Sequence, residues 1–340
     1  MEQKKFIDSL KQKDIKSCYL LHGEEQFLVK HYAKSIEDAC IGKISAGEDV
    51  THLKEIFDHT ATPNDIYMSA ITIPFFGIEP DKRRVIYVND SKLFVSGRKA
   101  DAEAMAGYLS KIPPDVTVIF TETDIDKRSK LFKELAKIGT VLDCQRPDTP
   151  TLSKWINRLV KEKGKTIAPA TIHKLIQTVG TDMHMVKNET DKLTAYLSAD
   201  EIEVTPQSID LICTKTLESR IFDLIDAMIA GNASQAVAMY NDMLIMRESP
   251  LMVLTMIIRQ FRIILLSKAA HAQGMNTYQA AAELKLRDFM VKKALTQGSK
   301  FTTDGLIAIL NHCLEMDVKV KTGAITPELG VEMLIVKYGI

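Results

Sequence analysis

The sequence has no excess of either charge, with 44 Lys and Arg residues balanced by 44 Asp and Glu among its 340 residues. A protein whose main task is to bind DNA is usually basic. We therefore expect any contact with DNA to come from a local patch or through partner proteins. DNA binding by the isolated chain should be weak and sensitive to salt.

Cysteines are few and scattered, and no two of them form a CxxC pair. This excludes a zinc ribbon and a disulfide framework, and it fits a reducing cytoplasm. The histidines show no HExxH or other paired-ligand spacing, and no Ser-His-Asp arrangement can be assembled from the sequence. We therefore predict no catalytic residue, no metal site and no cofactor. The five cysteines are Cys18, Cys40, Cys144, Cys213 and Cys313.

Long uninterrupted apolar runs are also missing. The N-terminal stretch MEQKKFIDSLKQKD is charged and lacks the apolar region of a secretory signal. The most apolar run, LMVLTMIIRQFRIILL from Leu251, is interrupted by Arg259, Gln260 and Arg262. It is too short and too charged to span a bilayer. We expect a cytoplasmic protein with no membrane contact.

What the chain does have, over residues 1–146, is an alternation of short β-branched runs with helical patterns. Such alternation predicts a doubly wound α/β domain with a parallel sheet. Strands are predicted at 17–22, 83–89, 115–121 and 140–144, with a weaker one near Ile44. Helices are predicted after Gly23 and at 51–60, 63–70, 98–111 and 126–139.

A polar connector with Pro147 and Pro150 predicts a domain boundary, after which we expect no further strands. Residues 147–214 are predicted to form a small helical domain, whose first helix would use Thr151 as its N-cap. Residues 215–340 show helical periodicity throughout and predict a bundle. The helix from Leu251 is apolar nearly all round, so it lies at the centre of the bundle or packs against another subunit. The candidate interface residues are Leu251, Leu254, Ile258, Phe261 and Leu265.

The stretch YLLHGEEQFLVK, residues 19–30, is predicted to be a buried strand, a turn at Gly23 and the start of a helix. A phosphate-binding loop at this place needs G-x-x-x-x-G-K-[ST]. The second glycine and the hydroxyl are missing, and Glu24 and Glu25 follow Gly23 directly. Two carboxylates favour the positive end of a helix and would repel a triphosphate. We interpret the stretch as a capped strand-to-helix turn, with a working nucleotide site as the alternative.

The predicted strand VIYVND ends in Asn89 and Asp90, where a nucleoside triphosphatase would carry a carboxylate for magnesium. A neutral amide is a poor replacement for that ligand. Together with the turn at Gly23, this pattern indicates a nucleoside-triphosphatase fold that has lost its chemistry.

The segment ITIPFFG, residues 71–77, places two aromatic side chains in an irregular region, because Pro74 breaks the preceding helix and Gly77 permits a tight turn. One interpretation is a core plug with one partly exposed ring. The other is an exposed hydrophobic element that docks into a pocket of a partner protein, as aromatic anchors do at interfaces.

These pieces together resemble the delta subunit of the bacterial DNA polymerase III clamp loader, over essentially the whole length. No single piece is decisive, but their order and spacing are specific. The resemblance is carried by YLLHGEEQFL, IPFFG with RRVIYV, DKRSKLFKELAKIGTVLDC, KWINRLVKEKG, NETDKLTAY, IFDLIDAMIAGN, IIRQFRIILLSK and LEMDVKVKTG.

The resemblance implies an AAA+-like core of two domains, residues 1–146 and 147–214, and a helical collar domain, residues 215–340. It implies a protein without a functional nucleotide site that binds the ring-shaped sliding clamp and opens it for loading on primed DNA. The clamp-binding role falls on Phe75 and Phe76, with Ile73 and Pro74 as support. Other clamp-loader subunits, including those that hydrolyse ATP, would bind through the collar.

Two alternatives remain. The chain could be a nucleotide-binding AAA+ protein with a degenerate loop at Gly23, Glu24 and Glu25. It could also be the paralogous inactive member of the clamp loader, although that protein usually carries a zinc-binding cysteine cluster, and the scattered cysteines disfavour it.

Overall fold

The computed structural model describes residues 2–42, 53–73, 82–198 and 200–339. The chain divides into two compact units, Met1–Arg146 and Pro147–Ile340. Pro74, Phe75, Phe76 and the weak strand predicted near Ile44 lie outside the described residues.

The first unit is built on a parallel sheet of five strands in the order β2-β3-β4-β1-β5. Strands β1, β3 and β4 are buried almost throughout, as expected for a parallel sheet covered on both faces. The strands are β1 (Cys18–His22), β2 (Lys54–Phe57), β3 (Arg84–Asn89), β4 (Val116–Glu122) and β5 (Thr140–Asp143).

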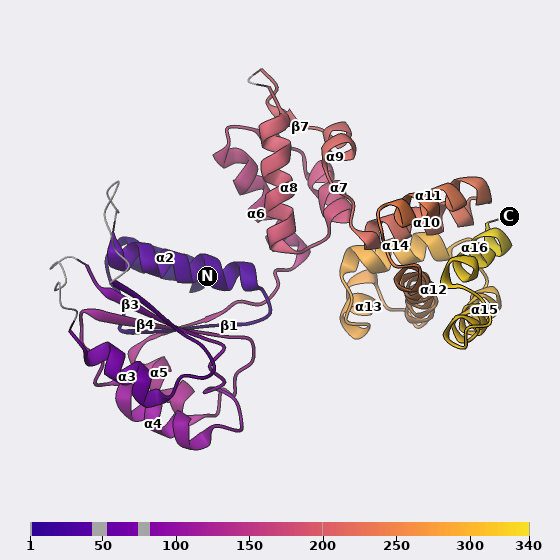
Figure 1. Ribbon diagram of the computed structural model, residues 1–340. Helices are drawn as coiled ribbons and strands as arrows, with labels where there is room; N and C mark the ends of the chain where they lie inside the picture. The colour runs from indigo at the N-terminus through magenta and orange to yellow at the C-terminus, as the bar shows by residue number, and fades with distance from the viewer. Residues whose placement is uncertain (1, 43–52, 74–81, 199, 340) are drawn as a thin grey trace. The chain divides into compact units, whose positions relative to one another are not determined.

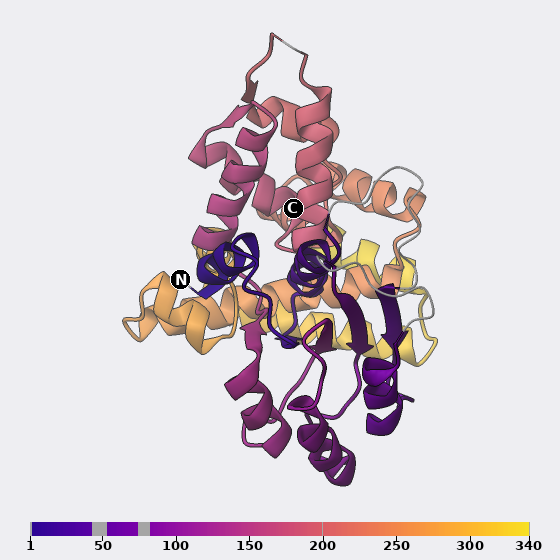
Figure 2. The ribbon, with the colours of Figure 1, turned by 90° about the vertical axis from the view of Figure 1, so that its left-hand side faces the viewer.

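Helices cover both faces of this sheet. Both views show α2 on one face and α3, α4 and α5 on the other (Figure 1 and Figure 2). The core on the second side includes Leu20, Val88, Phe120, Met105 and Leu135. The helices of this unit are α1 (Glu2–Lys11), α2 (Gln26–Ile41), α3 (Pro63–Ile71), α4 (Lys99–Leu109) and α5 (Lys130–Ile138). The predicted doubly wound α/β architecture is confirmed.

The helix predicted at 51–60 is wrong, because the edge strand β2 lies there and pairs with β3. Leu53, Ile56 and Phe57 stand at helical spacing, so their periodicity alone favoured a helix. At the sheet edge, however, the residues from Lys54 alternate between exposed and half-buried, which is the pattern of a strand.

The second unit begins with α6 (Thr149–Glu162), α7 (Pro169–Val179), α8 (Met183–Tyr196) and α9 (Pro206–Ile212). Two corrections apply here. The N-cap of α6 is Asp148, whose carboxylate accepts a hydrogen bond from the Thr151 N–H at 2.9 Å, and Thr151 itself is helical. Two short parallel strands, β6 (Thr166–Ile167) and β7 (Glu203–Val204), also interrupt the helices, where none was predicted.

Most of the remaining helices pack around the long helix α12 with one shared hydrophobic core, while α13 packs against α12 and α14 through a separate small apolar cluster. These helices are α10 (Leu217–Ile229), α11 (Ala233–Ile245), α12 (Pro250–Ala272), α13 (Thr277–Glu283), α14 (Asp288–Gly298), α15 (Thr303–Lys321) and α16 (Pro327–Tyr338). By length and composition alone α12 could cross a membrane, but its buried face forms the centre of this core. The division of this unit into a small domain and a collar stays a prediction.

The position of α12 corrects the predicted interface residues. Leu254 and Phe261 are buried in the core of their own bundle, and Ile258 and Leu265 pack against it. Of the predicted interface residues, only Leu251 is substantially exposed. One face of α12 packs on the other helices of the bundle, so its buried residues are not available to a neighbouring protein, while Leu251, Met252 and Leu266 remain on its exposed face.

Candidate functional site

The turn between β1 and α2 depends on the absence of a side chain at Gly23. Its backbone has φ of +135°, a conformation that favours glycine. A Cβ atom at this position would lie 2.5 Å from the carbonyl oxygen of Cys144, which follows β5. The glycine is therefore required by the close approach of two chain segments.

Backbone N–H groups of this turn are bonded to oxygens of the protein itself. Gly23 donates to the carbonyl of Glu122 at 3.1 Å, and Glu25 donates to the carbonyl of Cys144 at 2.9 Å. The N–H of Gln26 donates to the carbonyl of Glu24 at 3.1 Å. In a phosphate-binding loop such groups face the phosphates. Here they have acceptors already.

The start of α2 is capped by a carboxylate, as predicted. Glu25 is the N-cap, is only 5% exposed, and accepts a hydrogen bond from the Phe27 N–H at 3.2 Å. Glu24 is exposed and lies 3.6 Å from the guanidinium of Arg146. The helix N-terminus is stabilised by a nearby negative charge, and here the chain's own glutamates supply it.

The C-terminal end of β3, like the turn after β1, lies beside the C-terminal end of β4. Asn89 accepts a hydrogen bond from the Thr121 hydroxyl at 2.8 Å, and the Asp90 N–H donates to the Thr121 carbonyl at 2.8 Å. The Asp90 carboxylate pairs with Lys92 at 2.6 Å. Within the described parts of the chain, no three His, Cys, Asp or Glu side chains are grouped as metal ligands. The predicted residues therefore come together around the end of β4, with their polar groups engaged by the protein.

A cavity of about 590 Å³ adjoins Asn89 and Asp90 and is bounded by α2 and strands β2 to β4. One of its buried acids is Glu37, which receives hydrogen bonds from Lys34 at 2.7 Å and the Tyr87 hydroxyl at 2.6 Å, and an ion pair from Lys54 at 3.0 Å. Burial favours the neutral form, but these contacts outweigh it and lower the pKa of Glu37 to about 2. Glu37 is thus ionised and links α2 to Tyr87 of β3 and Lys54 of β2.

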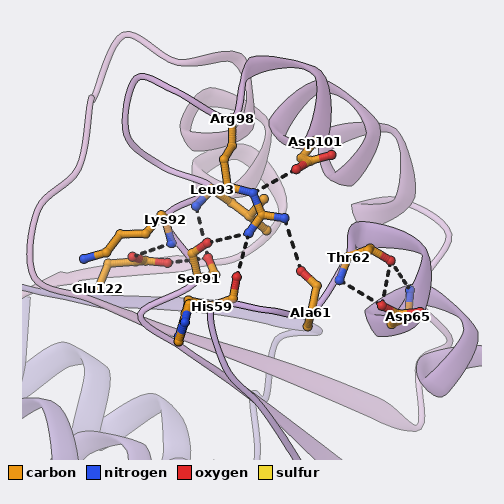
Figure 3. A network of polar contacts seen from close by, with 10 residues as sticks. All are labelled: His59, Ala61, Thr62, Asp65, Ser91, Lys92, Leu93, Arg98, Asp101 and Glu122. Carbon is orange, nitrogen blue, oxygen red and sulfur yellow. Dashed lines mark hydrogen bonds and ion pairs between the residues drawn. The ribbon is translucent and has the colours of Figure 1, made fainter.

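A polar network on the other side of the β3 end involves residues that the sequence did not single out (Figure 3). Glu122 is 2% exposed, and it accepts hydrogen bonds from the Ser91 hydroxyl and from the Lys92 N–H. Burial raises the pKa of Glu122 above its usual range. Arg98 donates to the Ser91 carbonyl at 2.9 Å and pairs with Asp101 at 2.8 Å. These contacts fix the segment between β3 and α4.

The described part of the predicted docking element is residues 71–73, which are the end of α3 and the two residues after it. Ile73 is 83% exposed, and it directly precedes Pro74, Phe75 and Phe76. Arg84, at the start of β3, is buried and donates hydrogen bonds to carbonyls at the end of α3. The sequence did not single out Arg84, because an arginine at the start of a strand gives no sign of the carbonyls that it will meet.

The fold class is a parallel α/β unit, in which N–H groups of the turn after β1 are bonded to the protein's own carbonyls, followed by a largely helical second unit. Two family models match the chain. The model described as DNA polymerase III, delta subunit matches residues 19–145, and the model for the C-terminal domain of the same family matches residues 218–338. The chain belongs to the DNA polymerase III delta subunit family, a component of DNA replication, as the resemblance predicted.

Individual relatives agree. The chain is 26% identical to DNA polymerase III subunit delta of Bacillus subtilis (strain 168), over 97% of this chain and 94% of that protein. It is 22% identical to a probable subunit delta of Aquifex aeolicus (strain VF5), over 69% of this chain and 66% of that protein. The solved structure of a Bacillus subtilis DNA clamp loader delta protein is similar in fold, with a TM-score of 0.68 and 24% identity over 99% of both chains.

Proposed function

We propose that this chain binds the sliding clamp through residues 73–76 and opens its ring for loading on primed DNA, without hydrolysing ATP. Family membership supports the assignment to the clamp loader. The observation that carries the non-hydrolysing part is the turn at Gly23, where N–H groups that would face a phosphate bond to Glu122 and Cys144.

The chemistry of such a protein is binding. A closed ring has a rare open state, and a protein that prefers the open form shifts the population only by its difference in affinity for the two forms. Ile73, Pro74, Phe75 and Phe76 are the proposed anchors, since buried aromatic side chains dominate interface energies. The α/β unit behind them would set the angle of the docked ring.

The remaining assignments extend this proposal. Other clamp-loader subunits, including those that hydrolyse ATP, would bind through a collar formed by residues 215–340. Of the predicted contacts in α12, Leu251 is the one that a neighbour could reach. Primed DNA would be met within the assembled complex, and the protein would act in the cytoplasm.

The test is the affinity of the full chain for the purified sliding clamp. Phe75→Ala with Phe76→Ala should weaken binding at least a hundredfold, because each buried ring contributes roughly 1.5–3 kcal/mol. Ile138→Ala is the matched control, since Ile138 is a 40% exposed apolar residue of the same unit at the end of α5. Undiminished clamp binding by the double variant would remove the docking assignment.

A further inference from the structure

Helix α3 is only nine residues long, yet its N-terminal end is tied to the fold several times. Thr62 and Asp65 form a capping box, with the Thr62 N–H donating to the Asp65 carboxylate at 2.9 Å. Arg98 reaches the residues just before the helix and donates to the carbonyls of His59 at 3.1 Å and Ala61 at 3.3 Å (Figure 3). The start of α3 is therefore fixed to the segment that follows β3.

The C-terminal end of α3 is held by a second arginine. Arg84 is 7% exposed, and its Nη1 donates to the carbonyls of Ser69 at 3.0 Å and Thr72 at 2.7 Å. Its Nη2 lies 3.6 Å from the carboxylate of Glu55 on β2, which also accepts a hydrogen bond from the Ser69 hydroxyl. The last carbonyls of a helix lack partners within the helix and carry partial negative charge. A guanidinium satisfies both needs.

One flank of α3 is fixed as well. The ring of Tyr67 stacks on Tyr108 of α4, with centroids 4.3 Å apart and planes within 5°. A helix of nine residues takes most of its stability from tertiary contacts, and burying a guanidinium is costly unless it is fully paired. The arrangement suggests that the exact direction of the helix matters.

The anchored end of α3 also exposes apolar side chains. Met68 is 48% exposed, Ile71 39% and Ile73 83%. All three lie within the last turn and the two residues after it, which is the part of α3 that Arg84 holds. Side chains of this kind gain free energy when a partner removes them from water.

We propose that Met68 and Ile71 extend the clamp-binding surface onto α3, and that Arg84 is a positioning residue for that surface. This inference rests on the proposed function. The clamp is the occupant because the apolar end of α3 runs directly into the proposed docking residues from Ile73 onward. Arg84 fixes the helix end before the partner arrives, so little ordering remains to oppose binding.

The first experiment tests the surface. The double variant Met68→Ala, Ile71→Ala should weaken binding of the purified clamp by about five- to tenfold, as expected for removing two partly exposed apolar anchors at an interface edge. Its melting temperature should stay close to that of the unchanged chain, since both side chains are exposed. Ile138→Ala again serves as the control with unchanged affinity. Affinity of the double variant equal to that of this control would overturn the extension onto α3.

The second experiment tests Arg84. Arg84→Met should weaken clamp binding about tenfold or more. Arg84→Lys should restore only part of the affinity, because one ammonium does not reproduce a planar fork bridging two carbonyls and a carboxylate. Arg83→Met is the matched control: Arg83 neighbours Arg84 in sequence, but its guanidinium donates to the carbonyls of Ile15 and Pro114, away from α3. Equal clamp affinity of the Arg84→Met and Arg83→Met chains would exclude the positioning role.

A structural loss must be distinguished from a positioning effect. If Arg84 acts through α3, combining Arg84→Met with the Met68→Ala, Ile71→Ala pair should lower affinity by less than the product of the separate effects. A full product would mean that Arg84 acts elsewhere, and the positioning role would be wrong. The Phe75→Ala, Phe76→Ala chain distinguishes failure of the inference on α3 from failure of the proposed function. If it loses clamp binding while the Met68 and Ile71 variant does not, the inference on α3 fails and the proposed function stands.

Discussion

Two places in the α/β unit are built in opposite ways. At the turn after β1, backbone N–H groups and the helix N-terminus are satisfied by Glu25, Glu122 and Cys144. At the end of α3, the backbone carbonyls are satisfied by Arg84, while the neighbouring apolar side chains, such as Ile73, are exposed. At the turn after β1, the N–H groups are bonded to acceptors of the protein itself. At the end of α3, the backbone carbonyls are held by Arg84 and the apolar side chains are exposed. The same sheet thus supports a closed site and an open one.

The greatest loss of stability should come from breaking the closed turn. Gly23→Ala combines the unfavourable φ of +135° with a Cβ atom 2.5 Å from the Cys144 carbonyl oxygen. We expect the free energy of unfolding, measured by urea denaturation, to fall by roughly 3 kcal/mol or more. Gly97→Ala is the control, because Gly97 has φ of +130° but no atom within 4 Å of the added Cβ. Equal losses in the two variants would show that the contact with Cys144 does not matter.

The next effect concerns the attachment of α2, the helix that starts at the closed turn. The pKa of Glu37 in the folded chain is about 2, below the ordinary value of 4.5. Folding therefore favours the ionised form, and its contribution is present above about pH 4.5 and lost as the pH falls towards 2. Its size is at most about 3 kcal/mol. Urea unfolding from pH 6 to pH 3 should show a smaller loss of stability for Glu37→Gln than for the unchanged chain; parallel curves would contradict this role.

A small loss of stability is expected from a change at the start of α3, because several contacts hold this end of the helix. Thr62→Ala removes the capping hydroxyl, which accepts a hydrogen bond from the Asp65 N–H at 3.2 Å. We expect a loss of about 1 kcal/mol in unfolding free energy. Clamp affinity should change little, because Arg98 still holds the carbonyls of His59 and Ala61. A large loss of affinity with intact folding would mean that the cap, and not the arginines, orients the helix.

The sequence predicted the closed site better than the open one. Gly23, Glu24 and Glu25 could be recognised because a phosphate loop has a fixed local pattern, and a departure from it is visible in a few residues. The parallel strands were likewise visible as short buried β-branched runs. What could not be predicted were contacts between distant segments, such as Arg84 with Ser69 and Thr72, since no local pattern encodes which carbonyls a side chain will meet.

The errors have the same origin. The apolar residues within 51–60 have helical spacing, but pairing with β3 at the edge of the sheet makes residues 54–57 a strand. Leu254 and Phe261 were assigned to an interface because the sequence shows that a helix is apolar all round without showing what surrounds it. In both cases tertiary context decided between structures that the local pattern allowed.

The proposal of a clamp-binding protein without nucleotide chemistry is tested most directly by the affinity of the isolated chain for the sliding clamp, measured by calorimetry with and without Mg–ATP. We predict the same affinity in both conditions and no heat of nucleotide binding, because the backbone N–H groups of Gly23, Glu25 and Gln26 already have acceptors within the protein. Saturable, magnesium-dependent ATP binding, or a clamp affinity that changes with ATP, would contradict the proposal.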